Sequence, residues 1–176
     1  MKSVSAIKAI LFDKDGTLID FEATWGPVNQ QIGLMAAKGD VGLAKAILDR
    51  CGVDAITGKT RPESPLAIAA ADEIAEALIE AGSRLSKPDL QNGLHQLFLQ
   101  AAQKAVPLTD LPELFMALQS QGFILGVASS DSAEAVAATI ETLGIKTLVD
   151  FHCGYNSGFG PKPEPGMIHE IGRAHV

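Results

Sequence analysis

The sequence has few cysteines, no long apolar run and no excess of basic residues. Its two cysteines, Cys51 and Cys153, lie far apart without metal-ligand spacing, so we predict reduced thiols. No apolar run reaches the roughly 18 residues that span a membrane. Met1–Val4 leads directly into an apolar segment and leaves no room for a signal peptide. We therefore expect a cytoplasmic protein with no membrane partner.

The charge balance is acidic, with a formal net charge of −7 over 176 residues. This excess of acid argues against nucleic acid as a partner. A hydrophobic content of 47% and a charged content of 20% are typical of a globular chain with one domain or two small ones. If this chain binds a phosphate, the positive charge must come from a metal ion, a lysine or helix N-termini.

The most informative stretch is an apolar segment, residues 6–12, that is interrupted only by Lys8 and followed by Asp13, Asp15 and Gly16. Such a segment is typical of a strand in a parallel sheet, and ligands bind beyond the carboxyl ends of these strands. Side chains alternate along a strand, so Asp13 and Asp15 should point the same way. Two acids in one pocket stay ionised together only beside a cation such as Mg²⁺; otherwise one is protonated. One acid could then be a nucleophile and the other a general acid/base. The alternative is a solvated turn.

A second apolar strand is predicted at residues 123–128, and it ends in the hydroxyl residues Ser129 and Ser130. A serine beside a helix N-terminus can donate a hydrogen bond to a phosphoryl oxygen, and nearby backbone N–H groups add positive charge. Asp131 and Glu134 have the spacing of a capping box for the helix that follows. The alternative is an ordinary helix cap with no ligand.

A third short strand is predicted at residues 148–153, and a proline-rich loop with Lys162 follows it. Lys162 lies between Pro161 and Pro163, which stiffen its backbone. A lysine held in this way could neutralise both a nucleophilic carboxylate and a transferring phosphoryl group. In isolation it could equally be a solvated lysine.

Taken in order, these three segments resemble motifs I to III of the haloacid dehalogenase (HAD) superfamily. The resemblance implies that Asp13 is the nucleophile, that Asp15 is the acid/base, and that both hold Mg²⁺, Asp15 through its backbone carbonyl. It further implies that Ser129, Ser130 and Lys162 bind the phosphoryl group. Lys14 occupies a variable position of motif I. Residues 154–165 look most similar to the branch that contains phosphoglycolate phosphatases.

Residues 20–105 lack strand patterns and place apolar residues such as Val28, Ile32 and Met35 at helical spacing. A connection this long should have its own structure and function. We therefore predict an α/β fold: a doubly wound parallel sheet formed by residues 1–19 and 106–176, with an inserted helical cap, residues 20–105. Trp25, Arg61 and Ser64 are possible substrate contacts in this cap, although packing and loop roles are the simpler interpretation.

The fourth motif of the superfamily, which would complete the Mg²⁺ site, is absent after Lys162. The last six residues, 171–176, match the translation of a common sequencing adapter, so we expect the natural protein to continue differently. We expect this chain to have an incomplete sheet with an exposed apolar edge, and to be poorly soluble and nearly inactive.

The predicted parent activity is Mg²⁺-dependent hydrolysis of a small phosphorylated metabolite, similar to phosphoglycolate, through an aspartyl-phosphate. Two alternatives use the same kinds of residue. One is a phosphomutase of the same superfamily, and the other is a non-enzymatic phospho-acceptor domain of the receiver type.

Overall fold

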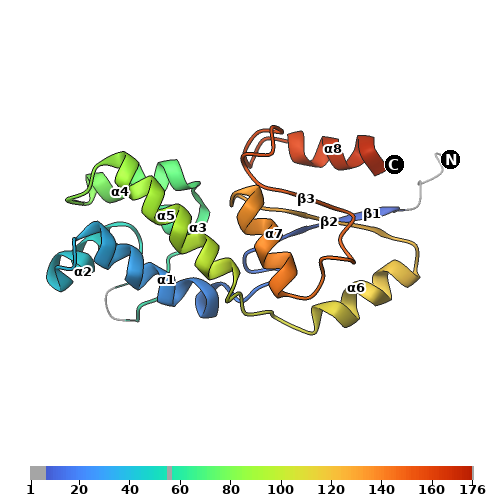
Figure 1. The fold of residues 1–176 in the computed structure, drawn as a ribbon, viewed down its shortest axis with the longest axis horizontal. Helices are drawn as coiled ribbons and strands as arrows, with labels where there is room; N and C mark the ends of the chain where they lie inside the picture. Colours follow the sequence, from blue (N-terminus) through green and yellow to red (C-terminus); the bar gives the residue numbers. More distant parts are fainter. Residues whose placement is uncertain (1–6, 55–56, 176) are drawn as a thin grey trace. The chain divides into compact units, whose positions relative to one another are not determined.

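The computed structural model describes residues 7–54 and 57–175, with side chains described up to residue 170 (Figure 1). Contacts divide the chain into two compact units. One unit contains the residues up to Ile19 and from Ala105 onward, and the other is Asp20–Lys104. The predicted change of sequence at residues 171–176 falls where side chains are not described.

The first unit contains a parallel sheet with the strand order β1-β2-β3. The strands are β1 (Ala9–Asp13), β2 (Ile124–Ala128) and β3 (Phe151–Cys153), and the helices are α6 (Leu111–Ser120), α7 (Ala133–Thr142) and α8 (Gly166–His175). Asp13 pairs in register with Ala128, and Ala128 pairs with Cys153. The carboxyl ends of all three strands therefore lie at one edge. The chain has the predicted α/β fold with an incomplete parallel sheet.

The two faces of this sheet are covered by different helices, because α6 and α7 lie on one side and α8 on the other (Figure 1). On the α6 and α7 side, Leu125 and Val127 of β2 are fully buried against Phe115 and Val136. On the other side, Met167 of α8 packs in a smaller cluster with Ala128 and Cys153. Coverage on both faces explains why β2 is apolar along its whole length.

Two strands differ from the sequence prediction. β1 begins at Ala9, later than its apolar run, and it lies half-buried at an edge of the described sheet, which agrees with the expected incomplete sheet. β3 begins at Phe151 and not at residue 148. Before it, the Leu148 N–H donates to the Ile145 carbonyl at 2.9 Å in a turn, so the residues near 148 are not extended. Asp150 then joins β2 through two bonds: its N–H donates to the Leu125 carbonyl at 2.8 Å, and its Oδ2 accepts from the Leu125 N–H at 2.9 Å.

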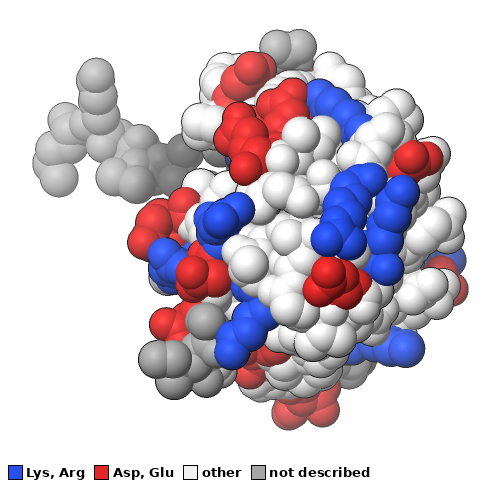
Figure 2. Space-filling model, turned by 90° about the vertical axis from the view of Figure 1, so that its left-hand side faces the viewer, with Lys and Arg blue, Asp and Glu red and all other residues white. Residues whose placement is uncertain are grey.

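The second unit is built of helices around its own core. They are α1 (Phe21–Ala36), α2 (Val41–Arg50), α3 (Pro65–Ile68), α4 (Ala71–Glu80) and α5 (Lys87–Ala102). Their shared core includes Ile32, Ile47, Leu78, Leu90 and Leu94, which are all buried. Acidic and basic side chains lie interspersed on the face shown in Figure 2. Among the ion pairs of this unit, Lys87 Nζ lies 2.9 Å from Asp72 Oδ1 and 2.6 Å from Glu76 Oε1.

Polar groups define two helix boundaries in this unit. α1 begins at Phe21 because Asp20 accepts a hydrogen bond from the Ala23 N–H at 3.0 Å. Residues 65–80 are divided into α3 and α4. The division occurs where Glu73 accepts a hydrogen bond from the Ala70 N–H, which starts a new helix.

The described part of the chain has no helix that is both long and apolar enough to cross a membrane. Cys51 and Cys153 are both buried free thiols, as predicted.

Candidate active site

The last residue of β1 and the proline-rich loop meet at the carboxyl edge of the sheet. Lys162 Nζ forms an ion pair with Asp13 Oδ1. The Lys162 side chain is 36% exposed and that of Asp13 is 47% exposed, so water and small molecules can reach both. This contact brings together two residues that the sequence analysis singled out from opposite ends of the chain.

The Lys162 loop is held by turns and by close packing. Gly160 has a positive φ of 81°, which favours glycine, and the Glu164 N–H donates to the Pro161 carbonyl at 2.8 Å. A Cβ on Gly166 would lie 1.7 Å from the Phe159 carbonyl oxygen, so a side chain cannot fit there. The Lys162–Pro163 peptide bond is cis. The turn at Gly160 and the close packing at Gly166 define the backbone on both sides of Lys162.

Asp15 lies in a tight turn that follows β1. Gly16 has a φ of 74°, and the Lys14 carbonyl accepts hydrogen bonds from the Leu18 N–H at 2.9 Å and the Ile19 N–H at 3.2 Å. The Asp15 carboxylate oxygen Oδ1 is 2.7 Å from Lys14 Nζ. The two predicted acids thus pair with different lysines: Asp15 with Lys14, and Asp13 with Lys162.

Ser129 follows Ala128, the register partner of Asp13, and so lies at the same edge of the sheet. It is fully buried, and its N–H donates to the Cys153 carbonyl at 3.1 Å. Its Oγ accepts a hydrogen bond from the Asp131 N–H at 3.1 Å, and the hydroxyl keeps its own proton to donate. Ser130 is partly buried. The two serines thus form the turn that leaves β2.

The predicted capping role of Asp131 is wrong. Ser132 is the N-cap of α7, and its Oγ accepts from the Ala135 N–H at 3.3 Å. Asp131 lies one residue too early for that role, and its Oδ2 is 2.8 Å from Lys14 Nζ. The Lys14 side chain is only 2% exposed. Sequence analysis treated Lys14 as a variable position, so it missed this buried pair; the only signal was a lysine directly after an apolar strand.

The two members of this pair affect each other's protonation. Burial lowers the pKa of Lys14, but the carboxylates of Asp131 and Asp15 outweigh burial and raise it above its ordinary value. Lys14 therefore remains a cation at neutral pH. Burial raises the pKa of Asp131, Lys14 opposes this effect, and the carboxylates of Asp15 and Asp13 reinforce it.

Gly154, the residue after β3, packs directly against the turn that follows β2. A Cβ on Gly154 would lie 2.3 Å from the Asp131 carbonyl oxygen and 2.4 Å from the Ala133 nitrogen. The Tyr155 N–H also donates to the Asp131 carbonyl at 2.9 Å. The turn with Ser129 and Asp131 is thus packed directly on the backbone that leads to the Lys162 loop.

The donor set at this edge fits part of a Mg²⁺ site. Mg²⁺ prefers oxygen ligands, and at phosphate sites it takes one or two carboxylates, with water and substrate oxygens for the rest. The Asp13 carboxylate and the Asp15 backbone carbonyl are oxygen donors of this kind. Across the described residues, no group of three or more histidine, cysteine, aspartate or glutamate side chains could hold a metal ion. Phosphate and water would have to supply the remaining ligands.

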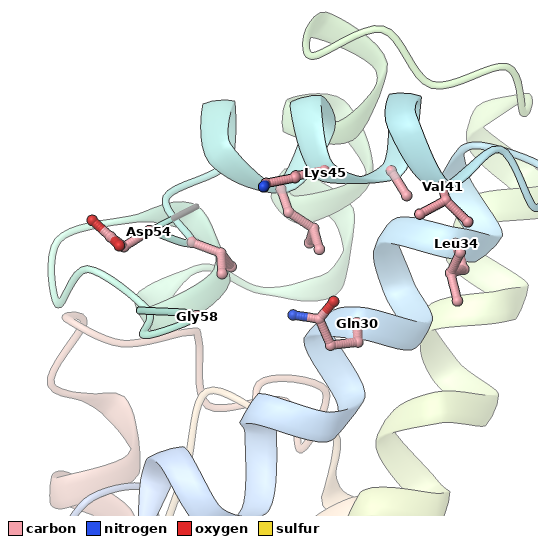
Figure 3. Close-up of a pocket in the computed structure, with 9 residues that line it drawn as sticks. Gln30, Leu34, Val41, Lys45, Asp54 and Gly58 are labelled. Carbon is pink, nitrogen blue, oxygen red and sulfur yellow. The ribbon is translucent and has the colours of Figure 1, made fainter. Parts of the chain in front are cut away.

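A separate hollow of about 300 Å³ lies within the helical unit, between α1, α2 and the loop that follows α2 (Figure 3). Its walls include Leu34, Val41 and Leu48, with Gln30 and Lys45 as polar groups. None of the predicted site residues lines it.

Three further residues of the helical unit were possible substrate contacts. Trp25 is buried, with its ring 5.2 Å from that of Phe98, so it packs in the core. Arg61 donates to the Asp49 carbonyl at 2.8 Å. Ser64 is buried, and within the described residues its Oγ has no hydrogen-bond partner.

The protein is of the α/β class, with a helical unit inserted after the first strand of a parallel sheet. Its polar site lies at the carboxyl ends of the strands, where Asp13 pairs with Lys162. The sequence matches the haloacid dehalogenase-like hydrolases over residues 7–174, and the chain belongs to this family. A comparison with curated proteins found no match.

Solved structures share this fold at low sequence identity. A predicted phosphoglycolate phosphatase from Haemophilus somnus has a TM-score of 0.65 at 18% identity, over 94% of this chain and 70% of that one. A predicted β-phosphoglucomutase from Thermotoga maritima has a TM-score of 0.61 at 17% identity, over 97% and 72%. L-2-haloacid dehalogenase from Xanthobacter autotrophicus has a TM-score of 0.53 at 16% identity, over 96% and 65%.

Proposed function

We propose that this protein is a Mg²⁺-dependent phosphomonoester hydrolase in which Asp13 is the nucleophile. The observation that supports this most strongly is the ion pair between Asp13 and Lys162 at the carboxyl edge of the sheet. A lysine at this position neutralises the carboxylate and can equally bind a phosphoryl group that approaches it. Family membership supports hydrolysis as the reaction class.

The reaction proceeds in two halves. An oxygen of Asp13 attacks phosphorus, the bond to the leaving oxygen breaks, and Asp15 gives that oxygen a proton. Water then attacks the aspartyl-phosphate while Asp15 takes a proton back, which releases phosphate and restores Asp13. Ser129, Ser130 and Lys162 bind the phosphoryl oxygens. Bound Mg²⁺, held by Asp13 and the Asp15 carbonyl, would supply charge neutralisation of the phosphoryl group.

A second carboxylic acid beside the nucleophile favours an ester over a halide as the leaving group. A departing alkoxide needs a proton, whereas a halide ion departs without one, so Asp15 has a use in ester cleavage that dehalogenation lacks. A phosphomutase would use the same groups and differs only in what accepts the phosphoryl group. The structural likeness to a predicted β-phosphoglucomutase keeps it as the second candidate.

The substrate that we propose is a small phosphorylated metabolite similar to phosphoglycolate, with the helical unit acting as a cap and the cytoplasm as the location. For the 176-residue chain itself we propose slow turnover, because its described residues offer few metal ligands. The test therefore follows the covalent intermediate and not only product.

The chain is incubated with Mg²⁺ and acetyl phosphate, reduced with borohydride, and mapped by peptide mass spectrometry. Reduction of the acyl phosphate marks the modified residue permanently, so a mark on Asp13 is the expected result. A mark on another carboxylate, or on none, contradicts the assignment. Parallel incubations with phosphoglycolate and with a hexose phosphate, followed by assays for free phosphate and for an isomeric sugar phosphate, separate hydrolase from mutase.

A further inference from the structure

Lys14 is a buried cation at the centre of the site. Its Nζ lies 2.7 Å from Asp15 Oδ1 and 2.8 Å from Asp131 Oδ2, and the side chain is 2% exposed. A buried ammonium group is costly unless it is paired and hydrogen-bonded. Here two carboxylates from different loops meet that requirement, one after β1 and one after β2.

Asp131 is anchored independently of Lys14. Its N–H donates to Ser129 Oγ, its carbonyl accepts from the Tyr155 N–H at 2.9 Å, and Gly154 packs against it. Asp15, in contrast, lies in the turn that contains Gly16. Lys14 therefore connects the Asp15 carboxylate to a firmly held part of the neighbouring loop.

We propose that Lys14 is a positioning residue that holds the Asp15 carboxyl group in place for proton transfer. This inference rests on the proposed function, in which Asp15 is the acid/base. Lys14 Nζ lies within hydrogen-bond distance of both Asp15 Oδ1 and Asp131 Oδ2, so the anchored Asp131 fixes the position of Nζ, and Nζ in turn fixes Asp15 Oδ1. With Oδ1 occupied as an acceptor, the proton of Asp15 is carried by Oδ2.

The test uses the whole 176-residue chain with Mg²⁺ and two phosphoryl donors. Acetyl phosphate has an acetate leaving group, which needs no proton, whereas phenyl phosphate releases a basic phenoxide that does. The rate at which Asp13 acquires phosphate is measured for each donor by borohydride trapping. In Lys14→Met we expect the phenyl phosphate rate to fall about tenfold or more, with the acetyl phosphate rate changed less than about threefold.

If Lys14 only stabilised the fold, replacing it would lower both phosphorylation rates together. The ratio of the phenyl phosphate rate to the acetyl phosphate rate is therefore the decisive readout. Lys146→Met is the matched control, since it removes a lysine from an exposed ion pair with Glu141 at 3.0 Å. It should leave both rates unchanged. Lys14→Met alone leaves Asp131 buried without its counter-charge, which can prevent folding.

Lys14→Met combined with Asp131→Leu removes both charges and should restore the folded state. The donor ratio should remain altered in this double variant. A ratio equal to that of the unaltered chain, in either variant, overturns the role of Lys14. If the unaltered chain acquires no phosphate on Asp13 from either donor, the proposed function falls and this inference falls with it.

Discussion

At the scale of single residues, Asp13 carries the largest expected effect. Asp13→Asn keeps the size of the side chain but removes the nucleophilic oxygen charge, so phosphate on residue 13 should fall below detection. The ion pair with Lys162 is partly exposed, so the free energy of unfolding should change by only about 0–1 kcal/mol. Trapping and thermal unfolding measure the two effects. Retained phosphorylation would contradict the assignment.

The cysteines give a prediction about pH. Burial, with the nearby Glu80 charge, raises the pKa of Cys51 to about 11, and burial raises that of Cys153, opposed by Lys162. The thiolate is the reactive form, so at pH 8 only about one Cys51 in a thousand is reactive.

Labelling of the folded chain by a thiol reagent should therefore be slow at pH 8 and should accelerate as the pH rises toward 11. The same chain in denaturant, where both thiols regain ordinary pKa values, should label quickly at pH 8. Fast labelling of the folded chain at pH 8 would contradict the burial of these thiols.

The neighbouring sequence predicted the contact of some site residues but not of others. Asp13 and Lys162 stand in short strings whose residue types are unusual together, and the structure brings their side chains into contact. Their catalytic roles stay a proposal. Lys14 and Asp131 lie in different loops, and no periodicity links them. Asp131 also satisfied a local capping pattern, which concealed its long-range partner.

At the scale of elements, the turn after β2 depends on a glycine that comes after β3. Gly154→Ala would place a methyl group 2.4 Å or less from the backbone of Asp131, Ser132 and Ala133. We expect a loss of about 1–3 kcal/mol in the free energy of unfolding, with slower phosphorylation of Asp13 because Ser129 lies in the displaced turn.

Gly42→Ala is the matched control for this substitution. Gly42 is exposed in α2, and the nearest atom to its added Cβ would be Asp40 Oδ1 at 3.6 Å. Alanine is the better helix former, so this variant should be neutral or stabilised by up to about 1 kcal/mol. Urea unfolding compares the two. If the two variants had equal free energies of unfolding, the turn after β2 would be able to shift away from the added methyl group without cost.

Element types were more predictable than element ends. The apolar run of β2 and the helical spacing in residues 20–105 indicated the correct kinds of structure. The helix ends depended on side chains that accept hydrogen bonds from backbone N–H groups: Asp20 at the start of α1 and Ser132 at the start of α7. Each of these hydrogen bonds depends on one polar residue, and a single residue forms no repeating pattern that the sequence could reveal.

At the scale of the whole molecule, the two compact units predict independent folding. All members of the core cluster in Asp20–Lys104 come from that segment, and the described helices pack on one another there. A fragment of residues 20–104 should give a helical circular dichroism spectrum and a cooperative thermal transition. Loss of cooperativity in the fragment would mean that the helices need the α/β unit.

The path of the chain explains why residues 20–104 can be separated from the α/β unit. Ile19, just before the helical unit, pairs with Pro107, just after it, and the Leu108 N–H donates to the Leu18 carbonyl. The points where the chain leaves and re-enters the α/β unit therefore lie side by side. An insertion at this point leaves the sheet register unchanged.

This arrangement has a consequence for biosynthesis. β1 is translated before the helical unit, yet Ala9 pairs with Ile124, so its hydrogen-bonding partner is translated only after all of Asp20–Lys104. The helices can fold from local contacts in the meantime. The strand that carries Asp13 lacks this partner during that interval, and a chaperone bound to β1 would protect it.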